Sequence, residues 1–190
     1  MRIFISGGCK NGKSTYAQLL AKHQSNPPHP LYYIATMKAV DSEDAERIVR
    51  HQDERDGWGF TTVEQYKDIE NILLTCDTKG SFLFDSTTAL LANEMFSPKG
   101  DIDETSVERI AAGLVNILSN INNIVVVSDY IYSDAYIYDD FSEKYRKSLA
   151  FLDCLTAKHC DVVLEATYTQ IITHKGEDFL KGMDHLDALH

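Results

Sequence analysis

The chain has 190 residues, 44% of them hydrophobic and 25% charged, a composition typical of one globular domain. Lysine and arginine total 18 against 29 aspartate and glutamate residues, and the net charge of −11 argues against a general nucleic-acid or anionic-membrane surface. The apolar run before Gly7 is too short for a signal peptide, and no stretch approaches a membrane-spanning length. We therefore expect a cytoplasmic protein that binds small molecules, with no nucleic acid and no membrane as partner. The four cysteines show neither a CxxC pair nor zinc-like spacing, so we expect reduced thiols.

Short apolar, β-branched runs alternate with helical patterns along the chain. Strands are predicted at residues 2–6, 31–35, 81–85, 123–128 and 161–165, with a further candidate at 169–174. Helices are predicted near residues 13–23, 42–55, 104–119 and 141–158. This alternation predicts an α/β fold with a mostly parallel sheet that is covered on both faces.

The stretch GGCKNGKST, residues 7–15, joins the first predicted strand to the first predicted helix and fits the phosphate-binding loop pattern G-x-x-x-x-G-K-S. Glycines let the backbone N–H groups wrap around phosphate oxygens, and the helix that follows presents its positive end. Lys13 is expected to reach the β and γ phosphates. Ser14 is expected to bind Mg²⁺ together with Asp85, which ends the strand at 81–85. The nucleotide-binding residues predicted in this loop are Gly7, Gly8, Cys9, Lys10, Asn11, Gly12, Lys13, Ser14 and Thr15.

The loop refines the fold class to a P-loop NTPase-like three-layer fold. We assign residues 1–175 to a single P-loop nucleotide-binding domain. Residues 176–190 form a C-terminal tail, either a short amphipathic helix or a solvated end. The alternative for the loop itself is a glycine-rich turn with a surface lysine.

The segment at residues 41–64 adds a second pattern. On a helix, Arg47, His51 and Arg55 lie four residues apart and share one face, so an imidazole lies between two guanidinium groups. Two such cations suit a phosphate chain and favour the neutral, nucleophilic imidazole. The alternative is a solvated face on which the arginines pair with Glu43 or Glu54. The spacing leaves both interpretations open.

Four segments then carry a resemblance: GGCKNGKS, YIAT at 33–36, RIVRHQDER at 47–55 with Glu64 beyond it, and FDSTTALLANEMF at 84–96. In this order they resemble the bifunctional adenosylcobinamide kinase and adenosylcobinamide-phosphate guanylyltransferase family of cobalamin biosynthesis. The resemblance implies that a cobinamide-type corrinoid is phosphorylated and then receives GMP from GTP, with ATP and GTP as substrates, Mg²⁺ as cofactor and a trimer as the assembly. It makes His51, in the motif R-I-x-x-H, the guanylylated residue, with Arg47 supporting the phosphates. It places further nucleotide contacts at Thr36, Met37, Lys38, Gln52, Asp53, Glu54, Arg55, Glu64 and Asp85.

The second half departs from the family pattern. Asp129 and Tyr130 stand where an Asn-Glu-Val-Gly turn is usual, and Ala150 and Asp153 replace Gly and Asn. The tyrosine-rich segment 129–140 follows a strand end, where open α/β sheets bind ligands, and its rings either cover a large planar substrate or pack. Three functions stay open: the bifunctional transferase, a P-loop kinase acting on another small alcohol, and a nucleotide-binding regulatory module.

Overall fold

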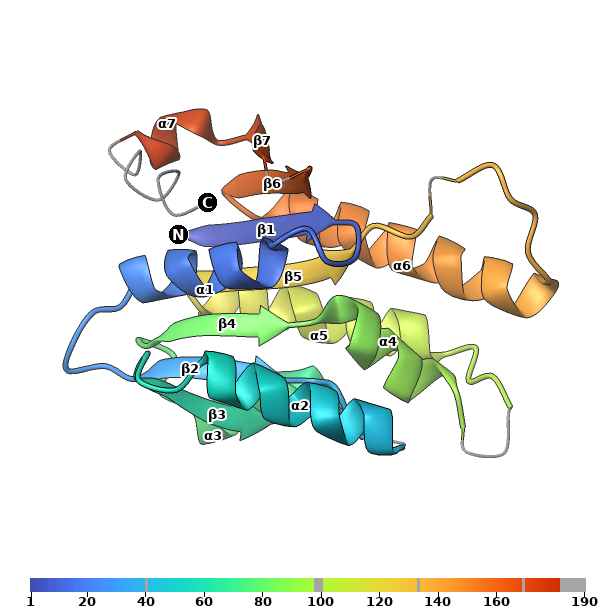
Figure 1. The fold of residues 1–190 in the computed structure, drawn as a ribbon, viewed down its shortest axis with the longest axis horizontal. Helices are drawn as coiled ribbons and strands as arrows, with labels where there is room; N and C mark the ends of the chain where they lie inside the picture. Colours follow the sequence, from blue (N-terminus) through green and yellow to red (C-terminus); the bar gives the residue numbers. More distant parts are fainter. Residues whose placement is uncertain (40, 98–100, 133, 169, 182–190) are drawn as a thin grey trace.

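One seven-stranded sheet runs through the protein in the order β3-β2-β4-β5-β1-β6-β7 (Figure 1). The computed structural model describes residues 1–39, 41–97, 101–132, 134–168 and 170–181, with all side chains in these ranges except those of residues 43–45, 47, 51 and 54. Strands β1 to β6 pair in parallel, and β7 is antiparallel to β6. The strands are β1 (Arg2–Gly7), β2 (Leu31–Ala35), β3 (Phe60–Glu64), β4 (Ser81–Asp85), β5 (Asn123–Asp129), β6 (Val162–Thr167) and β7 (Gln170–Lys175).

Helices cover both faces of this sheet. They are α1 (Lys13–His23), α2 (Ser42–Glu54), the 3₁₀ helix η1 (Ile69–Asn71), α3 (Ile72–Thr75), α4 (Thr87–Met95), α5 (Ser106–Asn120), α6 (Asp140–His159) and α7 (Glu177–Leu180). Figure 1 shows α1 and α2 on one face, with α5 and α6 on the other. The predicted three-layer α/β arrangement is confirmed.

Strand alternation divides the core into two layers. Along β1, Ile3 and Ile5 pack in the layer that contains α1, while Phe4 points into the layer built with α4, α5 and α6. Central strands buried on both faces explain why their sequences are continuous apolar runs.

The predicted strands at 2–6, 31–35, 81–85, 123–128 and 161–165 correspond to β1, β2, β4, β5 and β6. The candidate at 169–174 corresponds to β7, and the four predicted helices correspond to α1, α2, α5 and α6. Four elements were not predicted: β3, α4 and the short helices η1 and α3. Strand β3 exposes Thr61 and Thr62, so it lacks an apolar run, and α4 begins two residues after β4 ends.

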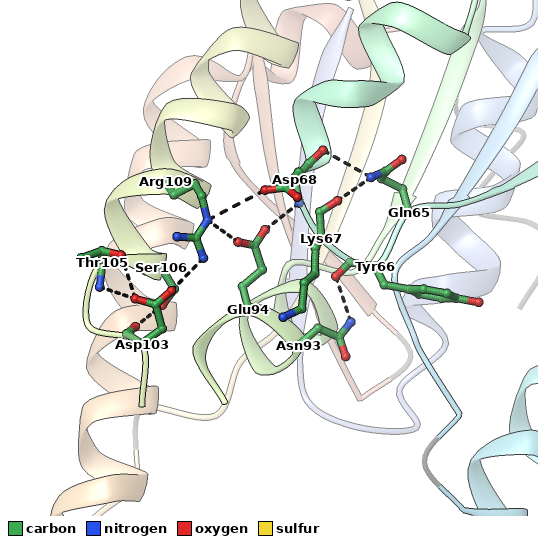
Figure 2. A network of polar contacts seen from close by, with 10 residues as sticks. All are labelled: Gln65, Tyr66, Lys67, Asp68, Asn93, Glu94, Asp103, Thr105, Ser106 and Arg109. Carbon is green, nitrogen blue, oxygen red and sulfur yellow. Dashed lines mark hydrogen bonds and ion pairs between the residues drawn. The ribbon is translucent and has the colours of Figure 1, made fainter. Parts of the chain in front are cut away.

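A polar network fixes the connection between β3 and η1 onto α4 and α5 (Figure 2). The buried Glu94 carboxylate accepts hydrogen bonds from Arg109 Nε at 2.8 Å and from the Asp68 backbone N–H at 2.9 Å. Asn93 Nδ2 donates to the carbonyl oxygens of Tyr66, at 3.2 Å, and Thr36, at 2.7 Å. The carboxylate of Glu94 raises the pKa of Arg109. The network therefore positions the segments that follow β2 and β3.

In the predicted tail, α7 covers Glu177–Leu180, and residues 182–190 lie outside the described part of the chain. The helices within the described ranges are all too short or too polar to cross a membrane. The four cysteines form no disulfide.

Candidate nucleotide site at the carboxyl edge of the sheet

The phosphate-binding loop is held against β6. Asn11 Nδ2 donates to the carbonyl oxygen of Ala166, and its Oδ1 accepts from the Lys13 backbone N–H at 3.3 Å. A Cβ at Gly7 would collide with that Ala166 carbonyl, so only glycine fits there. Gly12 has φ 83°, a left-handed conformation that favours glycine. The chain therefore turns sharply from β1 into α1, as the motif predicts.

Lys13 forms an ion pair across the mouth of this loop. Its Nζ lies 2.6 Å from a carboxylate oxygen of Asp129 and donates to the Gly8 carbonyl oxygen at 3.2 Å. The two side chains are only 9% and 22% exposed. Asp129 lies opposite Gly7 in the register of β5 and β1, and its backbone N–H donates to Thr88 Oγ1 at 2.9 Å. The backbone of Asp129 is thus fixed by α4, and its carboxylate lies beside the lysine.

Asp85 ends β4 at the same edge of the sheet. Because Ala35 pairs with Asp85 and Asp85 with Val127, the ends of β2, β4 and β5 lie next to one another. The Asp85 carboxylate accepts a hydrogen bond from Tyr33 Oη at 2.8 Å. Parallel strands therefore gather the phosphate loop, Asp85 and Asp129 at one carboxyl edge.

Thr36 joins β2 to the start of α4. Its hydroxyl donates to the Ser86 carbonyl oxygen at 2.8 Å and accepts from the Ser86 backbone N–H at 2.6 Å. Its own backbone N–H donates to the Asp85 carbonyl oxygen at 3.1 Å. Thr36 is completely buried, so in this structure its side chain shapes the edge. Met37 next to it is half-buried, and Lys38 is exposed.

Arg55 lies directly after α2 and is 7% exposed. Its guanidinium carbon lies 3.6 Å from the centre of the Tyr33 ring, a cation–π contact. Tyr33 also donates a hydrogen bond to Asp85, the expected Mg²⁺ ligand. The Tyr33 side chain therefore contacts both Arg55 at the end of α2 and Asp85 at the end of β4. Arg55 is therefore buried against the sheet, contrary to the alternative in which it lies on a solvated face. A cavity of about 370 Å³ lies beside Arg55, Gln52 and Phe60.

The remaining predicted residues are less closely gathered. Gln52 and Asp53 are exposed on α2, while the side chains of Arg47, His51 and Glu54, predicted on the same helix, lie outside the described part of the structure. Glu64 accepts a hydrogen bond from Tyr66 Oη at 2.6 Å, which raises the pKa of Tyr66 to about 12. Among the loop residues Cys9, Lys10 and Thr15 are exposed and Ser14 is half-buried.

Sequence reasoning missed Asp129, Tyr33 and Asp153 as parts of this region. Asp129 carried the same signal as Asp85, an acidic residue at the end of a buried strand. Asp153, on α6, is 2% exposed, and its Oδ2 accepts from Tyr132 Oη at 3.1 Å. Burial raises the pKa of this carboxyl to about 7.

Comparisons with known proteins agree with this geometry. The family model "Cobinamide kinase / cobinamide phosphate guanyltransferase" matches residues 3–170. Two proteins named bifunctional adenosylcobalamin biosynthesis protein CobU, from Escherichia coli K12 and Salmonella typhimurium LT2, are 30% and 32% identical to the chain over 105 residues. These alignments cover 54% of this chain and 55% of each relative, so the chain matches about half the length of these curated relatives.

One solved ATPase domain is 10% identical to the chain, with a TM-score of 0.51 over 93% of this chain and 77% of that one, a likeness of fold alone. The parallel sheet with the phosphate-binding loop between β1 and α1 makes the fold P-loop NTPase-like. The match of the family model over residues 3–170 is what assigns the sequence to a family. The chain belongs to the cobinamide kinase / cobinamide phosphate guanyltransferase family.

Proposed function

We propose that this protein phosphorylates a cobinamide-type corrinoid with a nucleoside triphosphate and transfers GMP from GTP to the product through a GMP-histidine at His51. The observation that carries the proposal is the phosphate loop, in which Lys13 pairs with Asp129. Strand β4 ends with Asp85 at the same edge of the sheet. The family match supplies the class of acceptor. The protein is a nucleotide-dependent transferase in this proposal, with ATP and GTP as substrates.

The kinase half of the proposal uses residues of the loop and the strand ends. Backbone N–H groups of the loop and Lys13 bind the phosphates. The acceptor hydroxyl oxygen attacks the γ phosphorus, the bond to the β–γ bridging oxygen breaks, and the hydroxyl proton passes to the Asp129 carboxylate. Mg²⁺ would be held by Ser14 and Asp85 and would neutralise phosphate charge. These hard oxygen donors fit it, because Mg²⁺ takes few protein ligands beside phosphate and water.

The guanylyltransferase half uses the helix that carries His51. An imidazole nitrogen attacks the α phosphorus of GTP, pyrophosphate leaves, and a phosphoramidate forms. A phosphate oxygen of the phosphorylated acceptor then attacks the same phosphorus and releases His51. Arg47 and Arg55 steady the phosphates, and Thr36, Met37, Lys38, Gln52, Asp53, Glu54 and Glu64 surround the nucleotide in this proposal. A trimer and a cytoplasmic location belong to the same proposal.

The experiment is to incubate the purified protein with GTP and Mg²⁺ and to weigh it intact. We expect one added GMP that survives alkali and is lost in acid, as an N–P bond is. His51→Ala should carry no GMP, yet should still phosphorylate cobinamide with ATP, because that step needs no histidine. His23→Ala, which removes an exposed histidine at the end of α1, is the control and should be labelled like the unchanged protein.

Other outcomes identify the alternatives. Phosphorylation of cobinamide without any GMP adduct would remove the guanylyltransferase half. If the protein phosphorylates a different small alcohol and carries no GMP adduct, it is a P-loop kinase. Lys13, Asp85 and Asp129 by themselves favour this function. Tight nucleotide binding with neither reaction would leave a regulatory module.

A further inference from the structure

An aromatic groove lies between the end of α4 and the beginning of α6. It encloses about 310 Å³ and is lined by Phe96, Ile131, Tyr138, Phe141, Tyr145 and Arg146. The Phe96 and Phe141 rings stack with centres 4.6 Å apart and planes 12° apart, and the Tyr145 ring lies 5.6 Å from Phe96. These rings pack on one another and form the apolar wall of the groove.

The groove is built by hydrogen bonds and does not depend on a ligand for its shape. Arg146, whose side chain is 10% exposed, donates to the Ile131 carbonyl oxygen at 3.0 Å and to Asp134 at 3.1 Å. Its guanidinium carbon lies 4.6 Å from the centre of the Tyr138 ring. These contacts hold the segment after β5 against α6, so the groove is preorganised.

Thr88 links Tyr145, which lines the groove, to Asp129 beside the phosphate loop. The Thr88 hydroxyl accepts from the Asp129 backbone N–H, and its carbonyl oxygen accepts from Tyr145 Oη at 2.9 Å. In addition, the Tyr130 backbone N–H donates to the Gly7 carbonyl oxygen at 3.0 Å. One residue of α4 therefore separates the groove-lining Tyr145 from Asp129 in this chain of hydrogen bonds.

The charge around the groove selects against anions. Residues 129–143 include Asp129, Asp134, Asp139, Asp140 and Glu143 and contain no lysine or arginine. Lys144, the next residue, is paired with Glu104. The guanidinium of Arg146 is already paired with carboxylates. A second nucleotide or a sugar phosphate would be repelled here, whereas an apolar body with a positive charge would be attracted.

We propose that the aromatic groove binds one edge of the corrinoid acceptor and directs its hydroxyl toward Asp129, an inference that rests on the proposed function. A corrinoid has a broad, largely apolar ring around a positively charged cobalt centre. The enclosed volume is too small for the whole ring, so one edge enters the groove. Tyr136 and Ile137, which precede Tyr138 in the chain, are exposed and offer apolar surface to the remainder of the ring.

The test measures binding of cobinamide by equilibrium dialysis, followed through its visible absorption, in the presence of a non-hydrolysable nucleotide. Phe141→Ala and Tyr138→Ala should each weaken cobinamide binding about tenfold, because each removes a ring face worth roughly 1.4 kcal/mol. The matched control is Phe151→Ala, an exposed phenylalanine on the same helix outside the groove. Nucleotide affinity should not change in any of these variants.

The outcomes separate the groove from the function. If the unchanged protein phosphorylates cobinamide and the groove variants bind it normally, the groove assignment is wrong while the function stands. If the unchanged protein binds no cobinamide, both the acceptor in the proposed function and the groove assignment are wrong. If the variants keep their cobinamide affinity but sediment as smaller assemblies, the groove is a contact between copies of the chain.

Discussion

At the scale of single residues, the pair of Lys13 and Asp129 dominates the electrostatics of the phosphate loop. The sequence predicted Lys13 and Asp85 because each belongs to a recognisable pattern. Asp129 also ends a buried strand, but nothing in the sequence tells which strand lies beside β1. Strand order comes from tertiary packing, so its closeness to Lys13 could not be predicted.

Asp129→Asn tests the role of this carboxylate as the base. The amide keeps the size of the side chain but accepts a proton poorly, so phosphorylation of cobinamide should fall about 100-fold. ATP affinity should hold or rise, because Lys13 loses its internal anion. Single-turnover rates and nucleotide titrations measure the two effects, with the exposed Asp101→Asn as control. A variant that turns over at the original rate would remove Asp129 from the chemistry.

Asp153 predicts a dependence of stability on pH. Its pKa is raised to about 7 in the folded protein by burial, against an ordinary value of 3.8, so between these values the folded state binds more protons than the unfolded state. The free energy of unfolding should therefore fall as pH rises from about 4 to about 7 and should be flat above. Asp153→Asn should remove this fall and raise the free energy of unfolding at pH 8 by about 2 to 4 kcal/mol.

Urea unfolding of the original chain and of the Asn variant at pH 5 and pH 8 measures this effect. If both chains lose the same stability between the two pH values, Asp153 is not the titrating group. Asp101→Asn serves as the exposed control here too, because its carboxyl lies on the surface.

At the scale of elements, apolar or periodic segments were predicted, the edge strand β7 among them, whereas β3, α4 and the short helices η1 and α3 were not. Strand β3 lies at one edge of the sheet and exposes two threonines, so its pattern does not differ from that of a loop. Helix α4 has nine residues and its buried side chains include Leu90 and Leu91, but it follows β4 with a single intervening residue. Its capping serine, Ser86, is the one local signal for its start.

Arg109→Ala tests the network that fixes the connection after β3. The change leaves the Glu94 carboxylate, whose side chain is 1% exposed, without its guanidinium partner. Because Arg109 itself is 37% exposed, we expect a loss of about 2 kcal/mol, below the range for a fully buried pair. Chemical denaturation measures it. Adding Glu94→Gln should recover part of the loss, and no recovery would mean that the damage lies elsewhere.

At the scale of the whole molecule, the alternation of strands and helices was sufficient to predict the fold class, because a parallel sheet needs helical crossovers. It could not predict that β5 separates β1 from β4, or that β7 turns back antiparallel. The sequence therefore predicted individual residues of the nucleotide site but not which of them lie next to one another. The sheet order explains why two acidic strand ends, Asp85 and Asp129, lie at the edge of the sheet that carries the phosphate loop.

The internal ion pair also has a consequence for timing. The Asp129 carboxylate belongs to the same chain as Lys13. It therefore remains the partner of Lys13 whatever the concentration of salt in solution. A bound triphosphate must take the place of this carboxylate at Lys13, and an anion of low charge, such as inorganic phosphate, is poorly equipped to do so. When a triphosphate does succeed, the carboxylate is released at that moment. In the proposed reaction, binding of the nucleotide and release of the Asp129 carboxylate are then one event, and Asp129 stays paired with Lys13 until the nucleotide binds.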